Sequence, residues 1–225
     1  MPVAVIFDFD GIIVDTEPLH YQAFQEILIP MGIGYSWEDY LLYYIGYDDR
    51  DAFRKTFLST GRILANGELD ALIEEKGALF QRIIASGVKP YPGVVELLHS
   101  IAGNLPLGLC SGALPSDVEP ILENLGLADT FDIMVTAADV QASKPDPESY
   151  ALAVTRLISA FPVKGITPGN CLAIEDTPAG IASARGAGLK VMAVTNSYPE
   201  EELAGADRIV ASLADINLHT LCNLF

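Results

Sequence analysis

The sequence predicts an α/β protein built on a doubly wound, Rossmann-like parallel sheet, and three observations support this. Short apolar runs alternate with helical patterns over most of the chain, as expected for strands joined by right-handed crossovers. The first run, AVIFDF at 4–9, is apolar at almost every position, which is typical of a parallel strand buried on both faces. One long interval with only helical patterns breaks the alternation and predicts a second, helical domain.

Six strands are expected from the apolar runs. After 4–9, the candidates in chain order are PLGLC at 106–110, FDIMV at 131–135, CLAIE at 171–175, KVMAV at 190–194 and RIV at 208–210. The helical patterns between them cover 94–102, 116–125, 147–159 and 178–188. The third of these patterns begins with a proline, which suits the first turn of a helix, and Gly126 follows the second as a stop signal.

A helical cap is expected between the first two strands. The interval contains four helical patterns: PLHYQAFQEIL, SWEDYLLYY, DRDAFRKTFLS and GELDALIEEKGALFQRIIAS. Because it is far too long for one crossover, we expect a core domain of residues 1–16 and 88–225 and a helical cap domain of residues 17–87. Hinges between the two are expected near residues 15–17 and 88–92.

Composition indicates which classes of partner and which cell compartment to expect. The chain of 225 residues has 30 acidic and 13 basic residues, a net charge of −17, which disfavours nucleic acid and anionic membranes as partners. The three cysteines, Cys110, Cys171 and Cys222, show neither a disulfide framework nor zinc-ligand spacing. Since no signal-peptide pattern follows Met1 and no apolar run approaches the ~18 residues of a membrane span, we expect a soluble, cytoplasmic protein, and a monomer.

Polar residues gather where the predicted strands end. In open parallel sheets, ligands bind outside the carboxyl ends of the strands. In chain order, these ends carry Asp8 and Asp10; Ser111, Gly112 and Ala113; Ser143 and Lys144; Glu175 and Asp176; and Asn196 and Ser197. Pleating predicts that Asp8 and Asp10, which are two positions apart, point to the same side.

This set of residue types suits metal-assisted phosphoryl transfer. Carboxylates as close as Asp8 and Asp10 repel each other, so either water solvates them or a cation lies beside them. Several carboxylate oxygens favour Mg²⁺, which also takes a substrate phosphate as a ligand. A lysine and a hydroxyl supply charge and donors for phosphate oxygens. One aspartate can then attack phosphorus while a second carboxyl group moves protons.

The motifs DFDGIIVDT, SGA, SKPDP and EDTPAGIASARGAG, in this order, resemble those of the haloacid dehalogenase (HAD) superfamily. The chain looks most like the branch of sugar-phosphate phosphatases, phosphoglycolate phosphatase and β-phosphoglucomutase, and the resemblance covers essentially the whole chain, including the position of the cap. It implies a Mg²⁺-dependent phosphatase that hydrolyses a small phosphorylated metabolite, of the sugar phosphate or phosphoglycolate type, through an aspartyl-phosphate. A phosphosugar mutase of the β-phosphoglucomutase type is the alternative within the same branch.

The resemblance also implies a role for each acidic or basic residue of the core. Asp8 would be the nucleophile and a Mg²⁺ ligand. Asp10 would be the general acid and base, with its backbone carbonyl also on the metal ion. Asp176 would be a metal ligand, and Glu175 would help directly or through water. Lys144 would neutralise charge on the aspartate and the phosphate.

The same resemblance assigns the phosphoryl group to the segment after the second strand. Ser111 would donate a hydrogen bond to that group, helped by the backbone amides of Gly112 and Ala113. Gly11 would permit close backbone approach at the turn after the first strand.

Four cap residues are candidates for substrate binding. They are Glu17 and His20 on the first cap helix, Gly46 in the loop that faces substrate in this branch, and Arg50 shortly after it. In β-phosphoglucomutase this loop carries an arginine, three residues after the glycine, that grips the distal phosphate. Here that position is Asp49, and the arginine follows one residue later, which weakens the mutase interpretation. The alternatives are a packing role for His20 and an ordinary surface charge for Arg50.

Two functions of other classes are kept as alternatives. A phosphorylatable signalling module of the receiver type also unites acidic residues, a hydroxyl and a lysine around Mg²⁺, but it holds no helical insertion after its first strand. A non-catalytic binding protein would lack a catalytic residue, and none is missing here. Dehalogenase activity is disfavoured by the acid at Asp10, and phosphonatase activity needs a cap lysine, for which Lys55 and Lys76 are candidates only by type.

Overall fold

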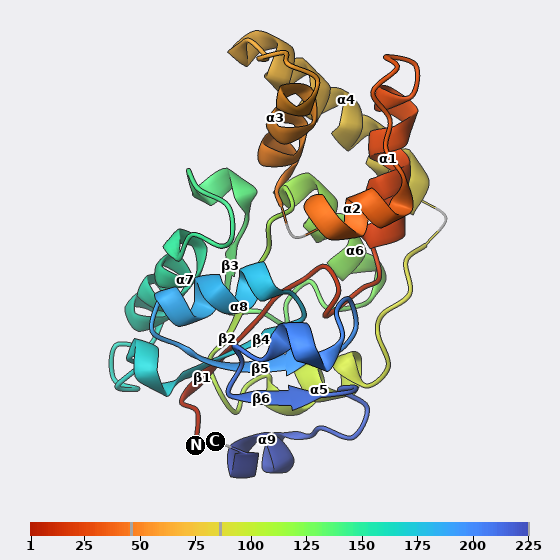
Figure 1. The fold of residues 1–225 in the computed structure, drawn as a ribbon. Coiled ribbons are helices and arrows are strands. Elements are labelled where there is room, and N and C mark those ends of the chain that lie inside the picture. The colour runs from red at the N-terminus through yellow and green to blue at the C-terminus, as the bar shows by residue number, and fades with distance from the viewer. Residues whose placement is uncertain (46, 86, 225) are drawn as a thin grey trace.

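The computed structural model describes residues 1–45, 47–85 and 87–224 and has a six-stranded, fully parallel sheet at its centre (Figure 1). The strands lie in the order β3-β2-β1-β4-β5-β6. Their bounds are β1 (Ala4–Phe7), β2 (Leu107–Cys110), β3 (Ile133–Val135), β4 (Cys171–Glu175), β5 (Lys190–Val194) and β6 (Arg208–Val210). All six strands fall within the apolar runs of the sequence, and the predicted α/β fold class is confirmed.

The strand order reverses at the middle of the sheet. The chain runs from β1 through β2 to β3 on one side and then crosses back to β4 on the other side of β1. Val5 of β1 is in register with Leu107 of β2 and with Leu172 of β4. The β1–β4 boundary is therefore a topological switch point, the place where open α/β sheets leave a crevice for ligands.

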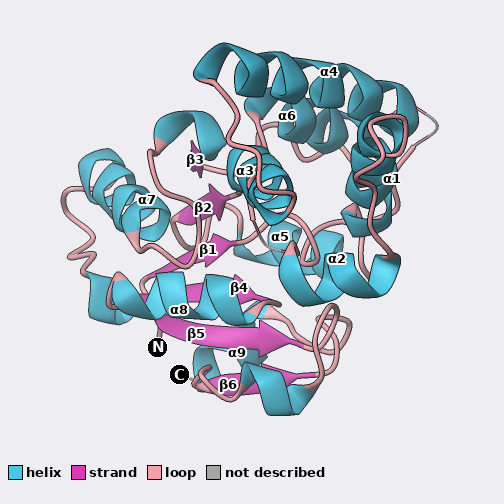
Figure 2. Ribbon diagram, turned by 45° about the horizontal axis from the view of Figure 1, so that its top comes forward, coloured by secondary structure: helices cyan, strands magenta, loops and turns pink. Residues whose placement is uncertain are grey.

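Helices cover both faces of the sheet (Figure 2). The core helices are α5 (Val94–Ile101), α6 (Pro115–Asn124), α7 (Glu148–Ala160), α8 (Pro178–Gly186) and α9 (Leu218–Leu224), with short 3₁₀ segments η1 (Ala137–Asp139), η2 (Pro168–Asn170) and η3 (Glu200–Leu203). Val5 and Phe7 share a buried cluster with side chains of α5 and α6, whereas Ala4 and Ile6 share one with side chains of α7 and α8. Alternate residues of β1 thus pack into two layers, which explains why the strand is apolar throughout.

Four helices follow β1 before the core resumes at α5. They are α1 (Glu17–Leu28), α2 (Trp37–Tyr43), α3 (Asp49–Ser59) and α4 (Asn66–Ile84), and they lie together beyond one end of the sheet (Figure 1). Ser36 and Asp48 start α2 and α3 by accepting a hydrogen bond from a backbone amide of the first turn. Phe24 of α1 packs edge-on against Phe53 of α3, with ring centroids 5.0 Å apart. The division of the chain into a core and a cap at 17–87 stays a prediction.

Polar contacts seat these helices on the core. Gln81 of α4 donates a hydrogen bond to Asp117 Oδ1 of α6 at 3.1 Å, and Ser143 Oγ donates one to Asp51 of α3. The pocket described below therefore has walls from both parts of the molecule. Across the described residues, no helix combines the length and apolarity needed to traverse a lipid bilayer.

The first strand is shorter than its sequence pattern suggests. β1 ends at Phe7, and the amide of Asp8 adds one further ladder bond, to the carbonyl of Ile174 at 2.9 Å. The chain then turns through Gly11, whose φ is +80°. β1 ends before both Asp8 and Asp10, so strand pleating does not orient them as predicted, although both side chains line the pocket described below.

Candidate active site

A buried lysine joins two acidic side chains at the switch point. Lys144 Nζ lies 2.6 Å from Asp8 Oδ1 and 2.7 Å from Glu175 Oε1, and it also donates to the Cys110 carbonyl at 3.3 Å. Burial alone would lower the pKa of Lys144, but the charges of Asp8 and Glu175 outweigh it and raise that pKa well above its ordinary value. Lys144 is therefore a fixed positive charge beside Asp8.

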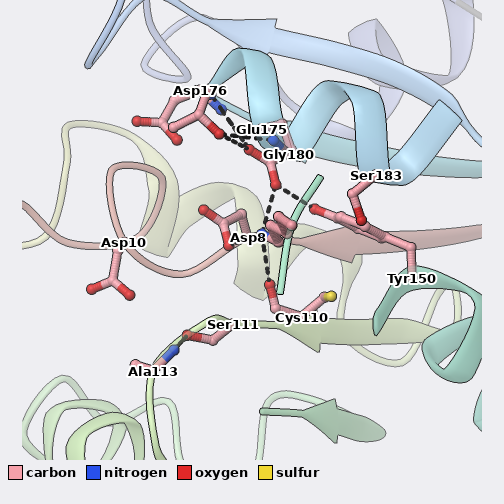
Figure 3. A network of polar contacts seen from close by, with 12 residues as sticks. Asp8, Asp10, Cys110, Ser111, Ala113, Tyr150, Glu175, Asp176, Gly180 and Ser183 are labelled. Atoms are coloured by element: carbon pink, nitrogen blue, oxygen red, sulfur yellow. Dashed lines mark hydrogen bonds and ion pairs between the residues drawn. The ribbon is translucent and has the colours of Figure 1, made fainter. Parts of the chain in front are cut away.

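Glu175 is held from several sides (Figure 3). Its Oε1 accepts hydrogen bonds from Lys144 and, at 2.8 Å, from the Tyr150 hydroxyl. Its Oε2 accepts one from the Asp176 amide at 3.1 Å and one from Thr177 Oγ1 at 3.3 Å. With both oxygens engaged by protein donors, Glu175 is arranged to position Lys144 and the start of α8.

Gly180 leaves the space that the Glu175 carboxylate fills. A Cβ atom at Gly180 would lie 2.0 Å from that carboxylate, and Gly180 is in the first turn of α8. The glycine in TPAGIAS therefore allows the helix to approach the buried acid. Its backbone amide donates to Thr177 Oγ1 at 3.0 Å, which caps α8.

Three buried carboxylates could hold a metal ion. One ligand atom each from Asp8, Glu175 and Asp176 lies within 4.8 Å of the others. Burial, and then the charges of neighbouring acids, raise the pKa values of Asp8 and Asp176 well above their usual range. Asp176 Oδ1 is buried with no hydrogen-bond partner, while Oδ2 accepts a hydrogen bond from Ser197. A hard cation would satisfy the orphaned oxygen and relieve the repulsion, so these residues fit Mg²⁺.

The turn after β1 brings backbone close to this cluster. A Cβ atom at Gly11 would lie 1.9 Å from Asp176 Oδ2, so a side chain there would displace the Asp176 carboxylate. Asn196 Nδ2 donates a hydrogen bond to the Gly11 carbonyl at 2.7 Å. Of the two residues that follow β5, Asn196 thus fixes the turn and Ser197 fixes the acid. Their positions after a predicted strand place both residues at this edge, but the sequence indicates no role for them.

Asp10 belongs to a second network that leads into the cap. Its Oδ1 accepts a hydrogen bond from Thr16 and lies 3.3 Å from His20 Nε2. Lys76 Nζ lies 2.7 Å from His20 Nδ1 and 2.8 Å from Asp49 Oδ1. Burial opposes ionisation of Asp10, but the hydrogen bond and charge of His20 outweigh it, so the pKa of Asp10 is lowered. Asp8 and Asp10 are therefore shifted in opposite directions.

The two networks open onto one pocket between core and cap. Its lining is Asp8, Asp10, Glu17, His20, Phe24, Tyr40, Tyr47, Asp49, Gly112, Ala113, Lys144 and Thr177. The core supplies the nucleophile candidate and the lysine, and the cap supplies aromatic and acidic side chains. Ser111 is buried at the same edge, where its Oγ accepts a hydrogen bond from the Ala113 amide at 3.0 Å. That amide is thus already engaged, whereas sequence analysis expected it to face the phosphoryl group.

The cap candidates separate into two groups. Glu17 and His20 line the pocket. Arg50 is not among the lining residues, and its guanidinium lies 3.8 Å from Asp48, at the start of α3. Gly46 lies outside the described residues. The functional roles assigned to all of these residues stay predictions.

Several partners of the predicted residues are not evident from the sequence. Thr16 lies in a predicted hinge, and Lys76 is one of two cap lysines, but neither position indicates a contact with the site. Tyr150, on α7, carried no signal at all. Contacts of this kind depend on how helices far apart in the sequence pack together, so no local motif could have shown them.

A doubly wound sheet with acidic residues and a buried lysine at its switch point, covered by helices, defines an α/β protein whose ligand site lies at the carboxyl edge of the sheet. The family model of the haloacid dehalogenase-like hydrolases matches residues 5–194, and the chain belongs to this family. The predicted recognition and enzyme class are thereby confirmed.

Relatives and solved structures agree with this assignment. Fructose-1-phosphate phosphatase YqaB of Escherichia coli strain K12 is 30% identical over 190 residues, covering 84% of this chain and 95% of that protein. β-Phosphoglucomutase of Bacillus subtilis strain 168 is 29% identical over 224 residues, covering 97% and 93%. The crystal structure of CbbY from Rhodobacter sphaeroides in complex with xylulose-(1,5)bisphosphate has a TM-score of 0.84 at 26% identity, covering 98% of this chain and 99% of that one.

Proposed function

We propose that this protein is a Mg²⁺-dependent phosphatase that hydrolyses a small phosphorylated metabolite, of the sugar phosphate or phosphoglycolate type, through an aspartyl-phosphate on Asp8. The observation that carries this proposal is the placement of Asp8 at the pocket, 2.6 Å from Lys144 and beside the orphaned oxygen of Asp176. A nucleophile, a fixed cation and a carboxylate oxygen without a protein partner suit phosphoryl transfer to an aspartate.

Asp8 would attack the phosphorus atom while the bond to the ester oxygen breaks. Burial and the charge of Glu175 raise the pKa of Asp8, whereas Lys144 acts in the opposite direction and favours its ionised form. Lys144 would also offset charge on the transferring group. Mg²⁺, held by Asp8 and Asp176, would supply a second positive charge for the phosphate oxygens. Glu175 would act by positioning Lys144.

Asp10 would move the protons. In the first step its carboxyl group gives a proton to the leaving alkoxide, and in the second it takes one from the water that attacks the aspartyl-phosphate. His20 and Thr16 orient Asp10 through contacts on one oxygen, Oδ1. Its lowered pKa favours the ionised form, which the second step needs, and disfavours the protonated form, which the first step needs.

Phosphosugar mutase activity is the second candidate, and the similarity to β-phosphoglucomutase favours it. A mutase uses the same aspartyl-phosphate but returns the phosphoryl group to a sugar. Incubation with β-glucose 1-phosphate and a trace of the bisphosphate separates the two. Free phosphate supports the phosphatase, and glucose 6-phosphate without free phosphate contradicts it.

A phosphate-release screen tests the proposed function. The substrates are phosphosugars, phosphoglycolate, nucleotides, polyol phosphates and p-nitrophenyl phosphate, each with Mg²⁺ and with EDTA. We expect release with Mg²⁺, loss of release with EDTA, and a loss of about a thousandfold or more in kcat for Asp8→Asn. Full activity of Asp8→Asn on this panel would contradict the mechanism.

A further inference from the structure

The cap end of the pocket carries negative charge where a second phosphate would need positive charge. We infer that the substrate is a phosphate monoester whose far end carries uncharged hydroxyl groups, and that Asp49 and Glu17 select this end. The inference rests on the proposed function, because it assumes that the phosphate of the substrate lies against Asp8 and Lys144. It narrows the substrate class to sugar or polyol monophosphates and excludes both bisphosphates and phosphoglycolate.

Asp49 lines the pocket and is held there by Lys76, which is not among the lining residues. Its Oδ1 lies 2.8 Å from Lys76 Nζ, whose side chain is 0% exposed, whereas the Asp49 side chain is 17% exposed. Lys76 lies against the rings of Phe24 and Phe80, at 5.2 and 4.8 Å from their centroids. Because Lys76 is enclosed and contacts Asp49 and His20, it holds the acid in place instead of offering charge to a ligand.

Glu17 gives the pocket a second fixed acid. Its Oε2 accepts a hydrogen bond of 2.5 Å from the Tyr40 hydroxyl, and both residues line the pocket. Carboxylate oxygens accept hydrogen bonds and cannot donate them when ionised. They therefore suit sugar hydroxyls, which donate, and repel phosphate or carboxylate groups, which are anionic acceptors.

The lysine that lines the pocket lies at the other end. Among the described residues that line the pocket, Lys144 is the single lysine or arginine, and it contacts Asp8 and Glu175. Arg50 is close in sequence, but it is absent from the lining and lies 3.8 Å from Asp48. The pocket is therefore built to bind one phosphate at the core end and a neutral group at the cap end.

The experiment compares matched ester pairs that differ in the charge of the far end. One pair is 2-hydroxyethyl phosphate and phosphoglycolate, and the other is the best sugar monophosphate of the screen and the corresponding bisphosphate. For each pair we define the selectivity as kcat/KM for the neutral ester divided by kcat/KM for the anionic ester. p-Nitrophenyl phosphate reports the core machinery in every variant.

We expect wild-type selectivity of about tenfold or more in both pairs, because like charges across a binding site are strongly disfavoured. Asp49→Asn keeps the size of the side chain and removes its charge, so selectivity should fall by about threefold or more. Asp70→Asn, on the exposed surface of α4, makes the same change away from the pocket and should leave selectivity unchanged. Glu17→Gln gives the same test as Asp49→Asn if the latter fails to fold, with the exposed Glu26→Gln of α1 as its control.

Two results overturn the inference alone: turnover of p-nitrophenyl phosphate with equal or better hydrolysis of the anionic esters, or selectivity in Asp49→Asn and Glu17→Gln that matches the controls. Failure to hydrolyse p-nitrophenyl phosphate and every other monoester would instead refute the proposed function, and the inference with it.

Discussion

Two buried lysines stand at the two ends of the pocket, and they differ in what they face. Lys144, from the core, contacts Asp8 at 2.6 Å and lines the pocket. Lys76, from the cap, contacts Asp49 at 2.8 Å but is enclosed by aromatic rings and is not part of the lining. Each lysine neutralises an acid, but of the two only Lys144 lines the pocket and can place its charge beside a bound molecule.

Both pairs consist of a buried lysine and an acid, so residue type does not distinguish them. What distinguishes them is which partner lines the pocket. At the core end both partners line the pocket, and Asp8 is the proposed nucleophile. At the cap end the acid is the partner that faces the pocket, and Lys76 supports it from behind. Variants of the two lysines should therefore fail in different ways.

The largest effect is expected for Lys144→Met. Removing the lysine leaves Asp8 and Glu175 without their shared cation, so kcat should fall by about a thousandfold. The free energy of unfolding in Mg²⁺-free buffer should fall by about 3 kcal/mol, because two buried acids lose their partner. Steady-state kinetics and urea denaturation measure both. A loss in kcat of less than tenfold would remove Lys144 from the mechanism.

Lys76→Met sharpens the comparison. The change leaves Asp49 and His20 without a shared donor, but Asp49 is partly exposed and water can solvate it. We expect a loss of about 1–3 kcal/mol in unfolding free energy and, with p-nitrophenyl phosphate, a decrease in kcat of less than about tenfold. If kcat falls as far as it does in Lys144→Met, the two lysines do not have the separate roles described here.

Alanine substitutions at two glycines distinguish the cost of crowding at the site from the cost of backbone strain. Gly11 and Gly61 have φ values of +80° and +78°, but a Cβ atom would meet Asp176 Oδ2 at 1.9 Å in the first and nothing within 4 Å in the second. Gly61→Ala should cost about 1 kcal/mol from the left-handed backbone alone. Gly11→Ala should cost about 2 kcal/mol more and weaken Mg²⁺ activation. Equal costs from thermal or urea unfolding would show that Gly11 does not approach Asp176 closely.

The smallest effect is expected for Ser197→Ala. Ser197 donates a hydrogen bond to Asp176, the carboxylate with an orphaned buried oxygen. Loss of a hydrogen bond behind a metal ligand should raise the Mg²⁺ concentration for half-maximal activity about tenfold. The control is Ser159→Ala, on the exposed side of α7. An unchanged Mg²⁺ requirement would argue against Asp176 as a ligand oriented by Ser197.

The core end could be predicted from the sequence because each of its groups directly follows a strand or lies in a short motif. Asp8 follows β1, Ser111 follows β2 and Glu175 ends β4, so the topology alone brings them to one edge. Six apolar runs identified the sheet for the same reason: buried parallel strands are apolar on both faces. The apolar run does not show where the first strand ends. The strand ends at Phe7, and Asp10 lies in the turn that follows.

The cap end could not be predicted in the same way. His20, Asp49 and Lys76 come from three different helices, and their contact depends on how those helices pack. The sequence shows that residue 49 is acidic, but not that a lysine 27 positions later holds it at the pocket. Arg50 was the more obvious candidate by residue type, and the helix directs it to Asp48 instead.

The most direct test of the central claim is detection of the phosphorylated residue. Asp10→Asn should slow breakdown of the intermediate, whereas its formation from p-nitrophenyl phosphate needs no general acid because p-nitrophenolate is a good leaving group. This variant is therefore mixed with p-nitrophenyl phosphate and Mg²⁺, quenched in acid, digested with pepsin and analysed by mass spectrometry. The account predicts a phosphoryl group on Asp8 that is absent when Asp8→Asn is added and absent with EDTA. Phosphate release with the phosphoryl group on another residue, or with no phosphorylated peptide in a single turnover, would contradict it.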